Sequence, residues 1–183
     1  MSDEPLGGVL MHINVSLSNE ADLKDLQDFL YAKSQENKYF IGLLETAANE
    51  VMIVTAIHNI KSNKGIKTTG VDKVKMDKYL QMPRENVVAL VQNNLYQYRP
   101  RPARRVYIAK GNGKQRPLGI PTILDRIIQE CIRLIIEPIC EVRFYPHSYE
   151  FRPYRAQKHA IVDIVHTVNL PAKPESKAVF ALE

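Results

Sequence analysis

Residues 102–122, which read PARRVYIAKGNGKQRPLGIPT, have the pattern of a β-hairpin that leads into a helix. Polar and apolar side chains alternate over 105–109 and over 116–120, as they do in half-buried strands. Gly111-Asn112-Gly113-Lys114 lies between the two runs and suits a tight turn. Thr122 is a favourable helix N-cap. The sequence therefore predicts two antiparallel strands followed directly by a helix.

The helix predicted after the hairpin extends from Thr122 through Ile136, and Pro138 then ends its regular geometry. Its apolar positions nearly encircle it, which indicates burial on more than one side; they are Ile123, Ile127, Ile128, Cys131, Ile132, Leu134, Ile135 and Ile136. Cys131 and Cys140 are the two cysteines of the chain. At a rise of about 1.5 Å per residue they lie too far apart in this helix for a disulfide, so we expect two free thiols and a reducing compartment.

Toward the amino terminus, the sequence predicts a poorly ordered lead-in over residues 1–18 and then two helices. The first covers 18–35 with Ser18 as its cap, and the second covers 39–62, where Gly42 marks a break or a close contact. The apolar residues predicted to face inward are Leu23, Leu26, Phe29, Leu30, Leu44, Ala47, Ala48, Val51, Val54, Ile57 and Ile60.

A polar loop over residues 63–72, with two glycines and no core pattern, follows these helices. A short helical turn is predicted at 76–80, and Pro83 begins a helix that extends to about Tyr96. Beyond the hairpin and its helix, residues 156–168 predict a further helix, and the apolar run 178–182 predicts a strand. Because a buried strand rarely ends a complete domain, we expect the chain to be a fragment.

The composition is that of a globular chain: 183 residues, 45% hydrophobic and 25% charged, suit one domain. No window approaches the roughly 18 apolar residues of a membrane span, and the acidic start lacks the pattern of a signal peptide. These features predict a cytoplasmic protein without a membrane partner. The net charge of +5 is unevenly distributed, because residues 1–50 carry nine acidic and three basic side chains.

The basic excess is greatest between Arg99 and Arg116, where no acidic residue occurs. The seven basic residues there are Arg99, Arg101, Arg104, Arg105, Lys110, Lys114 and Arg116. Tyrosines and prolines are interleaved with them, so extended backbone, cations and stackable rings occur together. This combination is typical of a groove that binds nucleic acid, and the alternative is an ordinary solvated face.

Three motifs resemble the reverse transcriptases encoded by group II introns. The string 102–122, followed by Asp125-Arg126-Ile127-Ile128-Gln129-Glu130, resembles their fingers hairpin. Residues 63–72 resemble the loop of their amino-terminal extension. Residues 148–155 resemble their next fingers motif, except that Glu150 stands where the family has glycine. The backbone conformation at position 150 is therefore expected to differ from that of the family. The motifs follow the family's order and cover about residues 40–168.

The resemblance implies an α+β fold: helix-rich fingers with a small antiparallel β-hairpin, truncated before the palm. It divides the chain into a lead-in and helix (1–38), extension helices with a template-binding loop (39–98), fingers (99–177) and the start of the first palm strand (178–183). The family's catalytic aspartates lie in palm motifs, and neither motif is present. Nucleotidyl transfer needs carboxylates that hold two metal ions about 4 Å apart. We therefore expect Mg²⁺ in the full-length polymerase, and no catalytic residue, metal site or cofactor in this chain, which should be inactive alone.

The resemblance assigns Arg104, Lys110 and Arg116 to the incoming triphosphate and the template. Independently, the even spacing of Arg104 and Lys110 places both on one face of a strand. Edge-strand solubility is the alternative for all three. The further residues expected to bind RNA are Lys64, Gly65, Lys67, Thr68, Thr69, Gly70, Arg99, Arg101, Arg105, Lys114, Arg152 and Arg155.

Alternatives remain for some of these residues. The loop over 63–72 could be mobile without any partner, and Arg152 and Arg155 could anchor the fingers helix instead of contacting template backbone. We interpret Asp125 as a structural acid, favoured in the first turn of its helix, that pairs with Arg126 or Arg155.

Two functions follow from these observations. In the first, the chain is the RNA-binding fingers and amino-terminal part of a group II intron reverse transcriptase and maturase, which assists intron splicing and mobility. The partners of the intact protein would then be intron RNA, an RNA template with its primer, and a deoxynucleoside triphosphate. In the second, the chain is a non-catalytic RNA-binding module from a truncated or repurposed relative, which forms a homodimer through its terminal strand.

Overall fold

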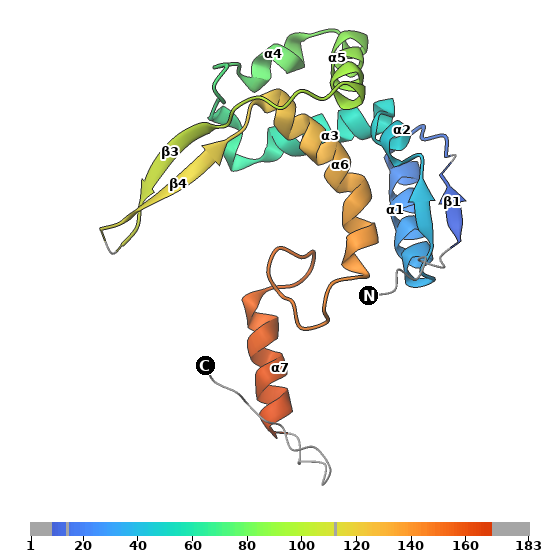
Figure 1. The fold of residues 1–183 in the computed structure, drawn as a ribbon, viewed down its shortest axis with the longest axis vertical. Helices are drawn as coiled ribbons and strands as arrows, with labels where there is room; N and C mark the ends of the chain where they lie inside the picture. Colours follow the sequence, from blue (N-terminus) through green and yellow to red (C-terminus); the bar gives the residue numbers. More distant parts are fainter. Residues whose placement is uncertain (1–8, 14, 112, 170–183) are drawn as a thin grey trace, which may run out of the picture. The chain divides into compact units, whose positions relative to one another are not determined.

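The computed structural model describes residues 9–13, 15–111 and 113–169, so the strand predicted at 178–182 lies outside the described residues. The chain divides into two compact units, Met1–Val142 and Arg143–Glu183. Helices and two two-stranded sheets make up the fold, which confirms the predicted α+β class (Figure 1). No helix in the described ranges has the length and hydrophobicity needed to cross a membrane.

The amino-terminal segment forms a β-α-β unit, in place of the predicted lead-in. Strand β1 (Leu10–His12) pairs in parallel with β2 (Tyr39–Ile41), and α1 (Glu20–Gln35) connects them. Ile13 and Leu17, each 6% exposed, join the hydrophobic core. Residues 10–13 and 15–17 are therefore structured, with Ile13 and Leu17 buried, and the prediction of a poorly ordered segment was wrong here.

Asn19, and not Ser18, is the N-cap of α1. Its side chain accepts a hydrogen bond from the backbone of Asp22, and the Asp22 carboxylate accepts one from the backbone of Asn19. This reciprocal capping box satisfies backbone N–H groups that the first turn leaves without helical partners. The Asp22 carboxylate also accepts from the backbone N–H of Ser18.

The helix predicted over 39–62 is three separate elements. They are β2, a short helix α2 (Leu43–Ala47) and helix α3 (Glu50–Ser62). Gly42 has φ +83°, a left-handed conformation that glycine adopts without strain, and it separates β2 from α2. The side chain of Asn49 caps α3 by accepting from the backbone of Val51. The predicted break at Gly42 is confirmed, and the single helix was wrong.

The remaining elements of the first unit follow the predicted order. They are the 3₁₀ turn η1 (Lys64–Lys67), helices α4 (Met76–Gln81) and α5 (Arg84–Tyr96), strands β3 (Arg104–Ala109) and β4 (Gln115–Ile120), and helix α6 (Ile123–Glu141). Pro83 precedes α5 as its N-cap, and Thr122 caps α6 as predicted. In the second unit, α7 (Gln157–Asn169) matches the predicted helix closely.

Helix α6 is central in the first unit, where it packs against α1, α2, α3 and α5 (Figure 1). Ile123, Ile127 and Cys131 on its buried side are fully buried. Burial raises the pKa of the Cys131 thiol to about 12, and Cys131 and Cys140 are both free thiols, as predicted. The apolar residues predicted to face inward that are instead exposed are Phe29, Leu44, Ile132 and Ile136. One side of α6 therefore faces solvent, because helices cover only the other.

Helix α6 continues through Pro138 to Glu141, although the proline was predicted to end its regular geometry. Proline has no N–H to donate to the carbonyl four residues earlier, which here belongs to Leu134. The side chain of Gln27 on α1 replaces that donor, since its Nε2 donates to the Leu134 carbonyl at 2.9 Å. The backbone oxygen thus keeps a partner and the helix does not break.

Candidate nucleic-acid interface

The β3–β4 hairpin places basic side chains on both of its faces. In its antiparallel register, Arg104 is opposite Ile120 and Ile108 is opposite Arg116. Residues opposite one another share a face, and alternate residues along a strand do so too. Arg104 and Arg116 therefore lie on one face, and Lys110 continues it, since its N–H donates to the Lys114 carbonyl at 2.7 Å. The predicted shared face is confirmed.

The opposite face of β3 carries Arg105 and Tyr107, both exposed. Lys110, Lys114 and Arg116 are exposed as well, while Arg104 is half-buried at the base of the hairpin. The Nε of Arg104 is shielded from solvent and makes no hydrogen bond to the described residues. Arg105 and Arg116 thus place exposed guanidinium groups on the two faces of the paired strands.

The 64–70 loop begins with η1 and is attached to the start of α6 by Arg126. The Arg126 guanidinium donates to the Gly65 carbonyl at 3.2 Å through Nη1 and to the Thr68 carbonyl at 2.7 Å through Nη2. Its Nε donates to the Pro121 carbonyl at 3.2 Å. Sequence reasoning considered Arg126 only as a partner of Asp125 and missed this role, because the loop is about sixty positions away.

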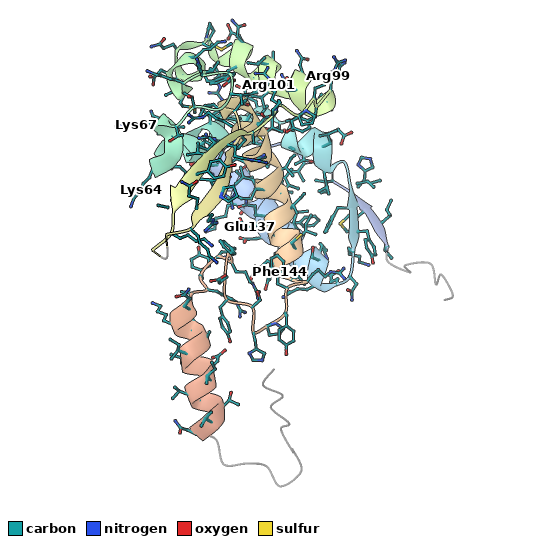
Figure 2. All side chains as sticks on the ribbon, turned by 60° about the vertical axis from the view of Figure 1, so that its left-hand side comes forward. Lys64, Lys67, Arg99, Arg101, Glu137 and Phe144 are labelled. Atoms are coloured by element: carbon teal, nitrogen blue, oxygen red, sulfur yellow. The ribbon has the colours of Figure 1, made fainter. Side chains whose placement is uncertain are left out.

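The two lysines of this loop remain exposed, as do Gly65 and Thr68, whereas Thr69 is half-buried. Figure 2 shows Lys64 and Lys67 projecting outward on the side of the first unit from which the hairpin extends. The loop therefore contributes two cations beside the base of the hairpin, and the structure brings together these two predicted sets of residues.

Gly70 is buried and packs against the backbone at the start of α6, away from solvent. A Cβ on Gly70 would lie 2.7 Å from the Cα of Thr122 and 2.9 Å from its backbone nitrogen. Such contacts are too short for any other residue type. Gly70 was predicted to bind RNA, and the structure gives it instead a close approach to Thr122 that joins the loop to α6.

Arg99 and Arg101 lie on the segment between α5 and β3 (Figure 2). Both are exposed, and Arg101 forms an ion pair with Asp72 in which Nη1 and Oδ2 are 3.4 Å apart. The Asp72 carboxylate thus partly neutralises Arg101, and it links this segment to the end of the polar loop.

Asp125 is buried, and its partners are not the predicted arginines. Its carboxylate accepts hydrogen bonds from the Thr122 hydroxyl at 2.6 Å and from the Tyr98 hydroxyl at 3.1 Å. Burial and the nearby Asp125 carboxylate raise the pKa of Tyr98, so the phenol remains protonated and donating. The structural role predicted for Asp125 is confirmed, and its pairing with Arg126 or Arg155 was wrong, because Arg126 points to the 64–70 loop.

In the second unit, Arg152 and Arg155 hold the loop that precedes α7. Nη1 of Arg152 donates to the Tyr145 carbonyl at 2.8 Å and to the Ser148 carbonyl at 3.1 Å, and Arg155 donates to the Pro146 carbonyl. Each guanidinium also lies over an aromatic ring, at 5.3 Å from Phe144 and 5.7 Å from Tyr149. Of the two roles considered, these contacts correspond to anchoring.

The corner at Glu150 keeps an ordinary backbone conformation, although the family has glycine there. The left-handed conformation falls on the next residue, Phe151, with φ 56°, and recurs at Tyr154 with φ 59°. Both side chains are essentially fully exposed.

Among the described residues, no three side chains of His, Cys, Asp or Glu gather in a group that could hold a metal ion. The chemistry of this surface is therefore that of arginine and lysine side chains, which attract phosphate groups and orient them by hydrogen bonding.

Comparison with curated proteins relates this sequence to intron-encoded proteins. It is 47% identical over 102 residues to Protein YkfC of Escherichia coli (strain K12), a match that covers 55% of this chain and 26% of that protein. It is 37% identical over 134 residues to Group II intron-encoded protein LtrA of Lactococcus lactis subsp. cremoris, covering 72% of this chain and 22% of LtrA.

A third relative is the Putative COX1/OXI3 intron 1 protein of Saccharomyces cerevisiae, at 27% identity over 154 residues, or 82% of this chain and 18% of that protein. The chain thus spans about a quarter or less of the length of these relatives. No protein-family model matches it. On these relationships, the chain is homologous to part of the group II intron-encoded protein LtrA and to part of several other intron proteins.

Proposed function

We propose that this chain is the RNA-binding fingers and amino-terminal part of a group II intron-encoded reverse transcriptase and maturase. The observation that carries the proposal is the juxtaposition of the basic β3–β4 hairpin with the lysines of the 64–70 loop, which Arg126 attaches beside it. Clustered exposed cations on defined backbone suit the regularly spaced phosphates of RNA.

In this proposal the two parts of the surface have different ligands. Arg104, Lys110 and Arg116, on one face of the hairpin, contact the incoming triphosphate and the template of the whole protein. The loop lysines and the exposed Arg99, Arg101 and Arg105 contact backbone phosphates without reading bases. Polymerisation by the whole protein would also require Mg²⁺ held by palm carboxylates, and no described residue group of this chain supplies that site.

A fluorescence-anisotropy titration tests RNA binding directly. The chain is titrated with a labelled group II intron RNA and with an unrelated structured RNA of equal length, at two salt concentrations. Because binding releases counterions, the logarithm of the association constant should fall with the logarithm of salt concentration, by about 0.7 to 0.9 per phosphate neutralised. A preference for the intron RNA would support maturase-type recognition by this part of the protein.

The double variant Arg104→Glu/Lys110→Glu identifies the site. We expect RNA affinity to fall by on the order of 100-fold at moderate salt, because two attractive contacts become repulsive. The matched control Lys24→Glu/Lys38→Glu makes the same change in net charge at α1 and just before β2, away from the hairpin, and should have a small effect. Equal losses in both variants would mean that net charge, and not this surface, governs binding.

A further inference from the structure

The contacts of Arg126 show how the 64–70 loop keeps its place. This side chain begins in the first turn of α6, and its three hydrogen bonds to described residues all end on backbone carbonyls. Two of those carbonyls, at Gly65 and Thr68, belong to η1 and the residue after it. Arg126 thus bridges the one turn of the loop that carries both lysines.

A second contact fixes the same loop a few residues later. Gly70 lies so close to Thr122 that only a residue without Cβ fits. Arg126 and Thr122 are neighbours at the start of α6, so the loop is attached to one helix end at two points. Lys64 immediately precedes the first of these points and Lys67 lies within it, and both side chains remain exposed.

The charges around the Arg126 guanidinium are consistent with a structural role, in which it acts as a brace that holds the 64–70 loop against α6. Burial lowers the pKa of Arg126 from its ordinary value, the neighbouring Arg104 lowers it further, and Asp72 opposes both. Arginine nevertheless remains protonated in proteins, so all its N–H donors persist. The closeness of Arg104 also shows that the brace lies at the base of the hairpin.

We propose that Arg126 is a positioning residue that holds the 64–70 loop against α6, so that Lys64 and Lys67 bind the phosphate backbone of the same RNA strand that contacts the hairpin. This inference rests on the proposed function. A lysine on a free loop would have to be ordered when RNA binds, whereas the brace orders the loop beforehand and removes that cost.

The test is a double-mutant cycle on RNA affinity. Arg126→Gln should weaken RNA binding about tenfold in the unaltered chain, and should have little effect when Lys64→Ala/Lys67→Ala is already present. The salt dependence of binding should become shallower to a similar extent in Arg126→Gln and in Lys64→Ala/Lys67→Ala. Equal effects of Arg126→Gln in the two backgrounds would overturn the proposal, since Arg126 would then act independently of the loop lysines.

Arg133→Gln is the matched control, because Arg133 lies on the same helix and binds the carboxylates of Glu130 and Glu137 and not the loop. It should leave RNA affinity nearly unchanged. If Arg126→Gln does not fold, Arg126→Lys retains the charge with fewer directed donors, and it should give a smaller loss that still disappears in the background without loop lysines.

Hydrogen exchange of the free protein separates this inference from the proposed function. Backbone amides over 64–70 should exchange faster in Arg126→Gln than in Arg133→Gln, without RNA present. Unchanged exchange would overturn positioning by Arg126 even if the chain binds RNA. Faster exchange in a chain that binds no RNA would overturn the proposed function and the RNA role of the loop, while the anchoring itself would stand.

Discussion

The arginines of the β3–β4 hairpin and those of the loop before α7 have opposite surroundings. On the hairpin, Arg105 and Arg116 extend into solvent. In the loop, Arg152 and Arg155 turn back to donate to the carbonyls of Tyr145, Ser148 and Pro146. Both segments were predicted to bind RNA, with anchoring as the alternative for Arg152 and Arg155.

The difference follows from what each backbone does with its carbonyl groups. In the hairpin, the antiparallel register pairs alternate strand carbonyls with strand N–H groups, and the remaining carbonyls lie along exposed edges where water can donate to them. An irregular loop has no such ladder, and its carbonyls need other donors. In these two segments, the arginines beside irregular backbone donate to its carbonyls, while Arg105 and Arg116 on the paired strands extend into solvent. Arg126 follows the same rule at the 64–70 loop.

The largest expected effect is a difference in stability between variants at the two ends of the 64–70 loop, of which Gly70 is packed and Gly65 is exposed. Gly70→Ala should destabilise the fold by about 2 kcal/mol, because its Cβ would overlap the backbone of Thr122. Gly65→Ala is the control, since a Cβ there meets nothing within 4 Å. Urea unfolding followed by circular dichroism measures both. Similar stabilities for the two variants would contradict the close attachment of the loop to α6.

A smaller effect distinguishes the two classes of arginine directly. Arg152→Gln should lower the stability of the second unit by about 1 kcal/mol, because two loop carbonyls lose a charged donor that is only partly buried. RNA affinity should change little. Arg105→Gln should do the reverse, weakening RNA binding about threefold to tenfold with stability unchanged.

Both variants, Arg152→Gln and Arg105→Gln, are compared by two measurements. Hydrogen exchange over residues 144–149 reports loosening of the loop, and anisotropy titration reports RNA affinity. If Arg152→Gln weakened RNA binding as strongly as Arg105→Gln without loosening the loop, the division into structural and ligand-binding arginines would fail.

The smallest expected effect concerns Glu130, whose carboxylate forms an ion pair with Arg133 on helix α6. Burial raises the pKa of Glu130, but the hydrogen bonds from Arg133 and Asn59 outweigh it, and the pKa is lowered overall from its ordinary 4.5. The unfolded chain then binds the proton more readily than the folded chain. Glu130 therefore contributes stability that is fully present above about pH 4.5 and is lost as the pH falls through its lower folded value.

Glu130→Gln should accordingly flatten part of the decline in the free energy of unfolding between pH 5 and pH 3, as measured by urea titrations. The exposed Glu85→Gln provides the control. An equally steep acid decline in Glu130→Gln and in the unaltered chain would show that the Glu130 pairing adds nothing on folding.

Patterns confined to one segment predicted the hairpin, the Thr122 cap and most helices. Alternation over 105–109 and Thr122 before an apolar run are local signals, and both hold in the structure. The parallel pairing of β1 with β2 could not be predicted, because three-residue strands are too short to show alternation. The division of 39–62 required recognising Asn49 as a cap inside an apolar helical pattern.

The candidate site was predictable in its charge and less so in its geometry. The cluster from Arg99 to Arg116 is visible in the sequence, as are the loop lysines. The braces are not, because Arg126 binds carbonyls 58 and 61 positions away, and the loop path that brings them near it depends on tertiary packing. Gly70 shows the same limit, since its contact is with Thr122 and not with a chain neighbour.

The contact between Gln27 and the Leu134 carbonyl has an evolutionary consequence. Because Pro138 withdraws the usual donor from that oxygen, the proline is tolerated only while α1 supplies another. A mutation that removes the Gln27 amide would be selected against as long as Pro138 is present, and neutral once an alanine replaces it. The two positions should therefore diverge together among descendants of this gene, although neither lies on the β3–β4 hairpin or the 64–70 loop.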